Sequence, residues 1–259
     1  MKLVEIKDRT LAVEPIYVDS VVDENTIVVF LHEALGSIGQ WKSFPSLICQ
    51  KLKLNGLVYE REGYGNSTDL LHVRTNRYLH NYAWDELPQL IETILPKDKR
   101  VILIGHSDGA SIALLYAAKF PSRVKAVVSM AAHVIVEDVT LKGIAPAVTA
   151  YQVGKLEGLK KYHGDKTEVL FYAWANTWNL AEFRDWNICE DIATIQCPVL
   201  AFQGVNDQYG TKLQLELIQK SIVEGKVEIH EIPNCGHHPH LEALAQSEQM
   251  ISSFISDLG

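Results

Sequence analysis

The chain alternates short apolar runs with segments of helical periodicity over most of its length. The runs are rich in β-branched residues and end at charges or turn residues, which is typical of buried strands. The predicted strands cover residues 26–31, 57–59, 101–104, 124–130, 199–202 and 227–232. The first ~18 residues also have an extended pattern, and we predict that they form an antiparallel edge of the sheet.

Helical patterns fill the intervals between these runs. The predicted helices cover residues 45–54, 83–94, 108–120 and 211–222. A last helix carries Ile251, Phe254, Ile255 and Leu258 at helical spacing, so this stripe is expected to face the core. Because strands that alternate with helices form a mainly parallel sheet covered on both faces, the pattern predicts an α/β fold.

One stretch breaks this alternation. Residues 134–195 show helical patterning but no convincing strand, and we predict a helical cap inserted into a single domain that spans residues 1–259. Trp174 and Trp178 lie four residues apart in this cap and share a face of a helix. Such aromatic residues either anchor the cap to the body or line a substrate pocket, and both interpretations can hold together.

The bulk composition narrows the class of protein. With 259 residues, 47% of them hydrophobic, the chain can bury a sizeable core. Its net charge of −8 includes no Lys/Arg cluster, which argues against nucleic-acid binding. No stretch approaches the ~20 apolar residues that cross a bilayer, and the N-terminus lacks the apolar core of a signal peptide. The four cysteines form no C-x-x-C pair and are expected to be reduced. We therefore expect a cytoplasmic protein that binds neither membrane nor nucleic acid, and its oligomeric state stays open.

The clearest chemical signal lies at residues 101–110, which read V-I-L-I-G-H-S-D-G-A. A buried strand runs into G-x-S-x-G and then into an amphipathic helix, which is the context of a nucleophile elbow. Gly105 and Gly109 allow the close backbone approach that this sharp turn needs. The turn is expected to present the Ser107 hydroxyl at the carboxyl end of the sheet, beside helix amides that favour negative charge.

A serine hydroxyl needs a base to take its proton, and the base needs a carboxylate to orient it, in the chain order Ser, Asp, His. Asp207 follows the strand at 199–202, where α/β sheets place their sites. Three histidines, His237, His238 and His240, follow the strand at 227–232. The chemistry of these residues does not choose among the three.

Over nearly its full length the sequence resembles the α/β-hydrolase superfamily. The tail G-H-x-P-x-x-E of that superfamily matches residues 236–242 and implies that His237 is the catalytic histidine. Likewise the pattern G-x-x-D matches residues 204–207 and implies Asp207 as the acid. The resemblance also implies a mainly parallel eight-stranded sheet with helices on both faces and an inserted helical cap.

On this interpretation the other histidines have minor roles. His238 remains the alternative base, whereas His240 is expected at the surface and His106 is expected to pack under the elbow.

An oxyanion hole needs two N–H donors, of which one is expected to be the amide of Asp108. Residues 31–37, L-H-E-A-L-G-S, resemble the family's H-G-x-x-G-S loop, which implies Ala34 as the second donor and His32 as the loop anchor. Residues 61–67 resemble the R-x-G-x-G-x-S turn, which implies structural roles for Arg61, Gly63, Gly65 and Ser67.

Two acidic residues depart from the family pattern. Glu33 stands where the oxyanion loop normally has glycine, and Asp108 stands where many relatives carry methionine, glycine or an aromatic residue. Because a carboxylate that faces the oxyanion raises the barrier, both are expected to point away and be paired. We expect Glu33 to pair with Arg61 or Arg77 and Asp108 to cap its own helix. In the alternative, one of them binds a cationic substrate group, such as that of an amino-acid ester.

Together these residues predict a serine hydrolase that cleaves a small ester, lactone or related carbonyl compound through an acyl-enzyme, without metal or cofactor. The candidate pocket residues are Glu33, His133, Trp174 and Trp178. A serine at the elbow disfavours the dehalogenase and epoxide hydrolase chemistries, which place aspartate there. The open alternatives are C–C bond or amide hydrolysis on the same fold, and a non-catalytic ligand-binding relative.

Overall fold

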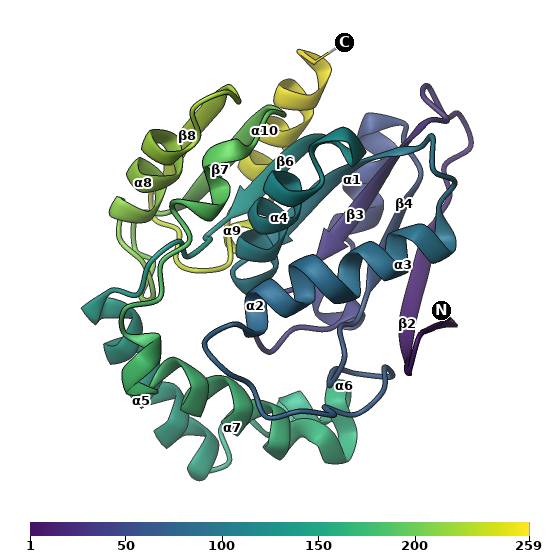
Figure 1. Cartoon of the computed structure of the whole chain (residues 1–259). Coiled ribbons are helices and arrows are strands. Elements are labelled where there is room, and N and C mark those ends of the chain that lie inside the picture. Colours follow the sequence, from purple (N-terminus) through teal and green to yellow (C-terminus); the bar gives the residue numbers. More distant parts are fainter. Residues whose placement is uncertain (259) are drawn as a thin grey trace.

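In the computed structural model, which describes residues 1–258, an eight-stranded sheet forms the centre of the molecule (Figure 1). The strand order is β1-β2-β4-β3-β5-β6-β7-β8. In this order, every neighbouring pair from β4 to β8 is parallel. Strand β2 is antiparallel to both of its neighbours, β1 and β4. The strands are β1 (Lys2–Ile6), β2 (Arg9–Ile16), β3 (Thr26–Leu31), β4 (Gly56–Tyr59), β5 (Arg100–His106), β6 (Val124–Met130), β7 (Val199–Gly204) and β8 (Val227–Ile232). The predicted mainly parallel sheet and its antiparallel edge are confirmed.

Successive side chains of the central strands enter two separate hydrophobic cores. In β3, Val29 and Leu31 join one core, whereas Val28 and Phe30 join the other. The same two-residue alternation continues along β5, because side chains of a strand point to opposite faces of the sheet. Both faces of the sheet are therefore buried, as the continuous apolar runs in the sequence predict.

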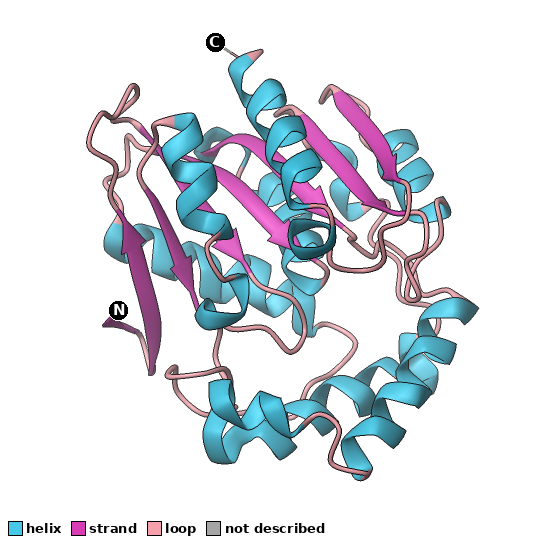
Figure 2. Ribbon diagram, turned by 180° about the vertical axis from the view of Figure 1, so that it is seen from behind, coloured by secondary structure: helices cyan, strands magenta, loops and turns pink. Residues whose placement is uncertain are grey.

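Helices cover each face of the sheet (Figures 1 and 2). One face is covered by α1 (Phe44–Leu52) and α10 (Leu244–Ser256), and the other by α3 (Leu87–Ile94), α4 (Asp108–Lys119) and α8 (Leu213–Ser221). A short α9 (Pro239–Glu242) precedes α10. In α10, Ile251 and Phe254 are buried in the core, as the helical stripe predicts.

The helix predicted at 83–94 begins earlier than expected. It starts with α2 (Tyr78–Asn81) and continues through a π-helical turn at Tyr82–Glu86 into α3. The wider turn directly precedes Pro88, which has no N–H to donate to the carbonyl of Trp84 and whose ring crowds that carbonyl. The early start brings Tyr78 and Tyr82 into the core.

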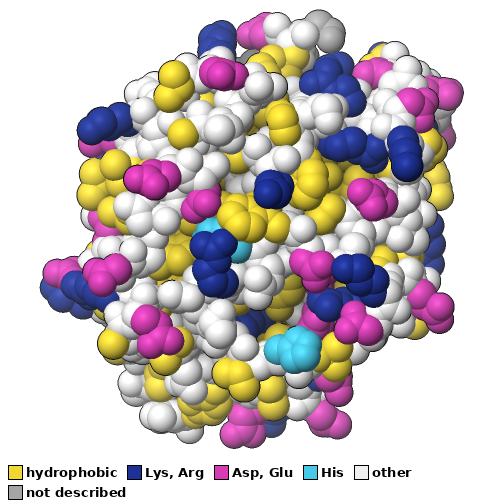
Figure 3. Space-filling view, in the orientation of Figure 1, with side chains coloured by type: hydrophobic (Ala, Val, Ile, Leu, Met, Phe, Trp, Pro, Cys, Tyr) yellow, Lys and Arg dark blue, Asp and Glu magenta, His cyan; other side chains and the backbone are white. Residues whose placement is uncertain are grey.

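Between β6 and β7 the chain forms α5 (Asp138–Gln152), α6 (Lys160–His163) and α7 (Thr167–Trp178), with short 3₁₀ turns. These helices lie beyond the carboxyl ends of the parallel strands, at the bottom of Figure 1. An inserted helical cap is thus present, and its extent over 134–195 as a separate unit stays a prediction. No helix within residues 1–258 is both long and apolar enough to cross a membrane. The face in Figure 3 mixes Lys and Arg with Asp and Glu.

Candidate active site

The turn between β5 and α4 holds Ser107 in a strained conformation with φ 52° and ψ −119°. A Cβ on Gly105 would lie 2.3 Å from the carbonyl oxygen of Gly109, and a Cβ on Gly109 would lie 2.0 Å from that of Leu31. Only glycine fits at these two positions, as the G-x-S-x-G motif predicts. The turn places Ser107 at the carboxyl end of β5, facing the cap.

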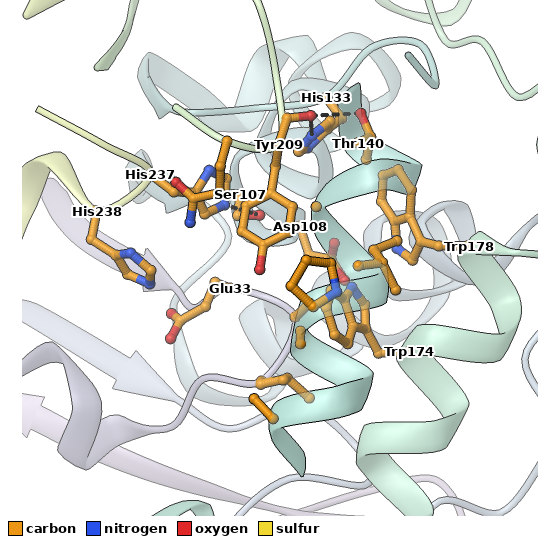
Figure 4. Close-up of a pocket in the computed structure, with 18 of the residues that line it drawn as sticks. Glu33, Ser107, Asp108, His133, Thr140, Trp174, Trp178, Tyr209, His237 and His238 are labelled. Atoms are coloured by element: carbon orange, nitrogen blue, oxygen red, sulfur yellow. Dashed lines mark hydrogen bonds between the residues drawn. The ribbon is translucent and has the colours of Figure 1, made fainter. Parts of the chain in front are cut away.

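Two loops bring a histidine and a carboxylate to this serine, and Figure 4 shows the histidine, His237, beside Ser107. His237, after β8, has its Nε2 atom 2.9 Å from Ser107 Oγ. Its Nδ1 atom lies 2.9 Å from Oδ2 and 3.0 Å from Oδ1 of Asp207, after β7. The three residues named from the sequence therefore form one continuous hydrogen-bonded chain, with the geometry that lets a histidine take the serine proton.

The environment of Asp207 keeps its carboxyl group ionised. Burial raises its pKa, but the hydrogen bond from His237 and the attraction of that ring lower it further, so the net shift is downward. The backbone N–H of Tyr209 also donates to Asp207 Oδ1, at 2.8 Å. An ionised carboxylate at this distance favours the tautomer of His237 with a proton on Nδ1, and Nε2 is then free to accept from Ser107.

The other two histidines of this loop do not reach the serine. His238 is half-buried, lines the cavity and has its pKa lowered to about 4, chiefly by burial. The expectation that His240 lies at the surface is wrong, because only 2% of the residue is exposed. Its ring packs 4.8 Å from Trp41 and 4.7 Å from His106. The short helix α9 folds the loop back under the elbow and so buries this side chain.

The oxyanion loop is held by buried side chains. The Arg61 guanidinium donates to the carbonyl oxygens of His32, at 2.5 Å, and Glu33, at 2.8 Å. His32 Nε2 accepts from the Arg61 amide at 3.3 Å, so its Nδ1 donates to the Glu33 carbonyl at 2.8 Å. These contacts agree with the structural roles implied for His32 and Arg61. Ala34 and Asp108 both line the cavity, and within residues 1–258 neither backbone amide has an acceptor.

The Glu33 side chain does not pair with an arginine as expected. Arg61 binds its carbonyl group instead, and Arg77 lies over the ring of Trp84. The carboxylate of Glu33 lies 3.4 Å from Nδ1 of His106, whose Nε2 donates to the carbonyl of His237 at 2.7 Å. Burial raises the pKa of Glu33, but His106, together with His240 and His32, lowers it, so the net shift is downward and the carboxylate stays ionised. His106 thus packs under the elbow, as expected, and also links Glu33 to the His237 loop.

The expectation that Asp108 caps its own helix is also wrong. Its Oδ2 atom accepts a hydrogen bond from Tyr78 Oη at 2.7 Å, and no side chain caps α4. A carboxylate at the first helical position already lies in the favourable field of the helix N-terminus. The hydroxyl group that pairs with Asp108 belongs to Tyr78, which is 30 residues away in the sequence. No local sequence pattern reveals this contact.

A cavity of about 800 Å³ opens above Ser107, between the body and the cap. Its floor includes Glu33, Asp108 and His237, and the predicted pocket residue His133 also lines it. The cap supplies a largely apolar wall that includes Val139, Ile144, Pro146, Leu159, Trp174 and Trp178. Trp178 also donates its indole N–H to Tyr78 Oη of the body at 2.9 Å, so it both anchors the cap and lines the cavity.

Sequence reasoning missed Tyr209, which joins the cap to the acid loop. Its ring stands 4.8 Å from the ring of His237, and its carbonyl accepts from Thr140 Oγ1 at 2.5 Å and from His133 Nε2 at 3.1 Å. A Cβ on Gly143 of α5 would lie 2.7 Å from this ring. The only sequence signal is its position two residues after Asp207.

Fold and site together define an α/β-hydrolase, and comparison with known proteins agrees. The sequence profile of the Alpha/beta hydrolase family matches residues 28–248. The chain belongs to this family.

Among characterised relatives, the human protein named serine hydrolase BPHL is 27% identical over 237 residues, which are 88% of this chain and 78% of the relative. The enol-lactonase from Burkholderia xenovorans LB400 has a similar fold, with a TM-score of 0.75 at 14% identity over 98% of this chain and all (100%) of that one. A thermophilic esterase from Thermogutta terrifontis gives a TM-score of 0.72 at 17% identity over 100% and 99% of the two chains. At these identities the two structures show the shared fold alone.

Proposed function

We propose that this chain is a serine hydrolase that cleaves a small ester, lactone or related carbonyl substrate through an acyl-enzyme. The observation that carries the proposal is the hydrogen-bonded chain from Asp207 through His237 to Ser107 at the floor of a cavity. A cavity of about 800 Å³ suits a small molecule. The relatives named as a serine hydrolase, a lactonase and an esterase support the same reaction class.

The reaction begins when Ser107 Oγ attacks the substrate carbonyl carbon while His237 Nε2 takes the hydroxyl proton. The carbonyl electrons move to oxygen, and the amides of Ala34 and Asp108 donate to this oxyanion. When the oxyanion collapses, the bond to the leaving group breaks and His237 returns the proton to it. Water then attacks the acyl-enzyme in the same way, with His237 as base, and releases the acid and Ser107.

The cavity also supports a narrower substrate class, in which the ester carries an amine. Asp108 uses only Oδ2 for Tyr78, and within residues 1–258 its Oδ1 has no hydrogen-bond partner. Glu33 contributes a second ionised carboxylate to the floor. A cationic group of an amino-acyl ester can neutralise such charge in a poorly solvated cavity. Asp108→Asn is then expected to weaken amino-acyl esters far more than neutral esters, and equal losses would contradict this role.

The first test is a hydrolysis screen of p-nitrophenyl esters of increasing acyl length, with amino-acyl esters and simple lactones, for wild type and Ser107→Ala. Turnover by wild type that disappears in the variant supports the serine nucleophile, and the optimal acyl length gives the size of the site under the cap. Activity that survives in Ser107→Ala would refute the mechanism. If wild type turns over none of these substrates, C–C or amide hydrolysis or a binding role replaces the proposal.

A further inference from the structure

Three buried side chains connect the cap to the residue after the nucleophile. Trp178, at the end of α7, donates its indole N–H to Tyr78 Oη at 2.9 Å. Tyr78 donates to Asp108 Oδ2 at 2.7 Å. Trp178 and Asp108 are each 2% exposed and Tyr78 is 3% exposed. This chain of hydrogen bonds therefore runs through the protein interior, from the cap to the first residue of α4.

The direction of these hydrogen bonds is fixed by the chemistry of the groups. An indole N–H can only donate, so the Tyr78 oxygen must accept from Trp178. The phenol has a single proton, which is then available only to Asp108. Burial, followed by the negative charge of Asp108, raises the pKa of Tyr78 well above its ordinary value, so this proton is retained. Tyr78 is consequently a permanent donor to the carboxylate.

The position of this carboxylate matters for the reaction proposed above. The Asp108 amide is a proposed oxyanion donor, and the side chain begins one atom away from that amide. Rotation of the charged group toward the oxyanion would place two negative charges close together in a largely apolar cavity, which raises the barrier. A strong hydrogen bond on the far side opposes that rotation.

We infer that Tyr78, held by Trp178 of the cap, is a positioning residue that keeps the Asp108 carboxylate away from the oxyanion and leaves one of its oxygens for the cavity. This inference rests on the proposed function. It assigns a role to Tyr78 and Trp178, which lie outside the Ser–His–Asp chain. It also makes catalysis depend on how the cap packs against the body.

The test is a double-mutant cycle with a neutral p-nitrophenyl ester. Tyr78→Phe removes only the hydroxyl group and is expected to lower kcat on the order of tenfold, with a smaller change in KM. In the Asp108→Asn background the harmful charge is gone, and the same substitution is expected to cost less than about threefold. An equal cost in both backgrounds would show that Tyr78 acts only through packing and would overturn the inference.

Tyr82→Phe is the matched control. Its hydroxyl is also buried and donates to the Glu62 carbonyl at 2.9 Å, and within residues 1–258 it forms no hydrogen bond with Asp108. We expect it to have the same effect in both backgrounds. Trp178→Phe keeps an aromatic ring and removes the indole N–H, so a loss of kcat that Asp108→Asn relieves supports the link to the cap. If Trp178→Phe causes no such loss, the cap has no part in positioning Asp108.

The rate at which a fluorophosphonate labels Ser107 separates this inference from the proposed function. A wild-type protein that neither labels nor hydrolyses esters refutes the serine hydrolase and the inference together. A wild type that labels, with no coupling between Tyr78 and Asp108 in the labelling rate, refutes the positioning role alone.

Discussion

Replacement of Asp207 by asparagine should reverse the tautomer of His237. Oδ1 of Asp207 accepts the backbone N–H of Tyr209 at 2.8 Å, so the amide oxygen of an asparagine is held at this position. The NH₂ group then takes the place of Oδ2, which lies 2.9 Å from His237 Nδ1. The amide oxygen at the Oδ1 position still lies 3.0 Å from Nδ1, but the closer NH₂ group can only donate and opposes a proton on Nδ1, which favours the tautomer with its proton on Nε2. Nε2 then points a proton at Ser107 and can no longer act as base.

The expected loss in kcat is on the order of 10⁴-fold, which corresponds to about 5.4 kcal/mol of transition-state stabilisation. The assay is hydrolysis of the best p-nitrophenyl ester at neutral pH, with thermal unfolding as a check that the variant is folded. Asp207→Ala is the informative companion, because it removes the carboxylate without forcing the tautomer. A loss below about tenfold in a folded Asp207→Asn variant would refute the tautomer argument.

Three further predictions concern the structure that supports the site. Burial raises the pKa of Glu86 to about 8, so its contribution to stability is present below its unfolded pKa of about 4.5 and is lost as the pH rises through 8. The unfolding free energy of wild type, measured in urea titrations, should therefore fall as the pH rises from 5 to 9. Glu86→Gln should make this fall smaller, and an unchanged pH dependence in the variant would contradict the prediction. Phe30→Ala empties a site beside the stacked rings of Trp41 and Phe44 and should cost about 3–5 kcal/mol of unfolding free energy, so a loss below about 1 kcal/mol in urea titrations would contradict it. Gly143→Ala places a Cβ 2.7 Å from both the Tyr209 ring and the Gln208 carbonyl oxygen, so the chain must shift beside the site and ester turnover should fall; unaltered kinetics would show that the cap tolerates the shift.

The residues of the site that follow a strand could be predicted from the sequence. Ser107, Asp207 and His237 each lie in the loop or turn that follows a strand, and the parallel sheet brings the ends of these strands to one edge. The choice of His237 over its neighbours needed the family pattern, because His237, His238 and His240 follow the same strand within a few residues of one another.

The contacts that tune the site could not be predicted in this way. Tyr78 is 30 residues from Asp108 and 100 residues from Trp178 along the chain. Their hydrogen bonds depend on how α2 and the cap pack, which hydrophobic periodicity does not specify. The same limit explains why both expected partners of Glu33 were wrong and why His240 was expected at the surface.

The two acidic residues beside the proposed oxyanion hole lose solvation free energy, and this loss bears on their function. Glu33 and Asp108 line a largely apolar cavity, where an ionised carboxylate loses part of its solvation. Each has one partner on the side away from Ser107, His106 for Glu33 and Tyr78 for Asp108. These partners fix the positions of the two carboxylates but do not fully neutralise their charge. A glycine or methionine at either position would avoid the cost, so keeping two carboxylates there supports the amine-bearing substrate class proposed above.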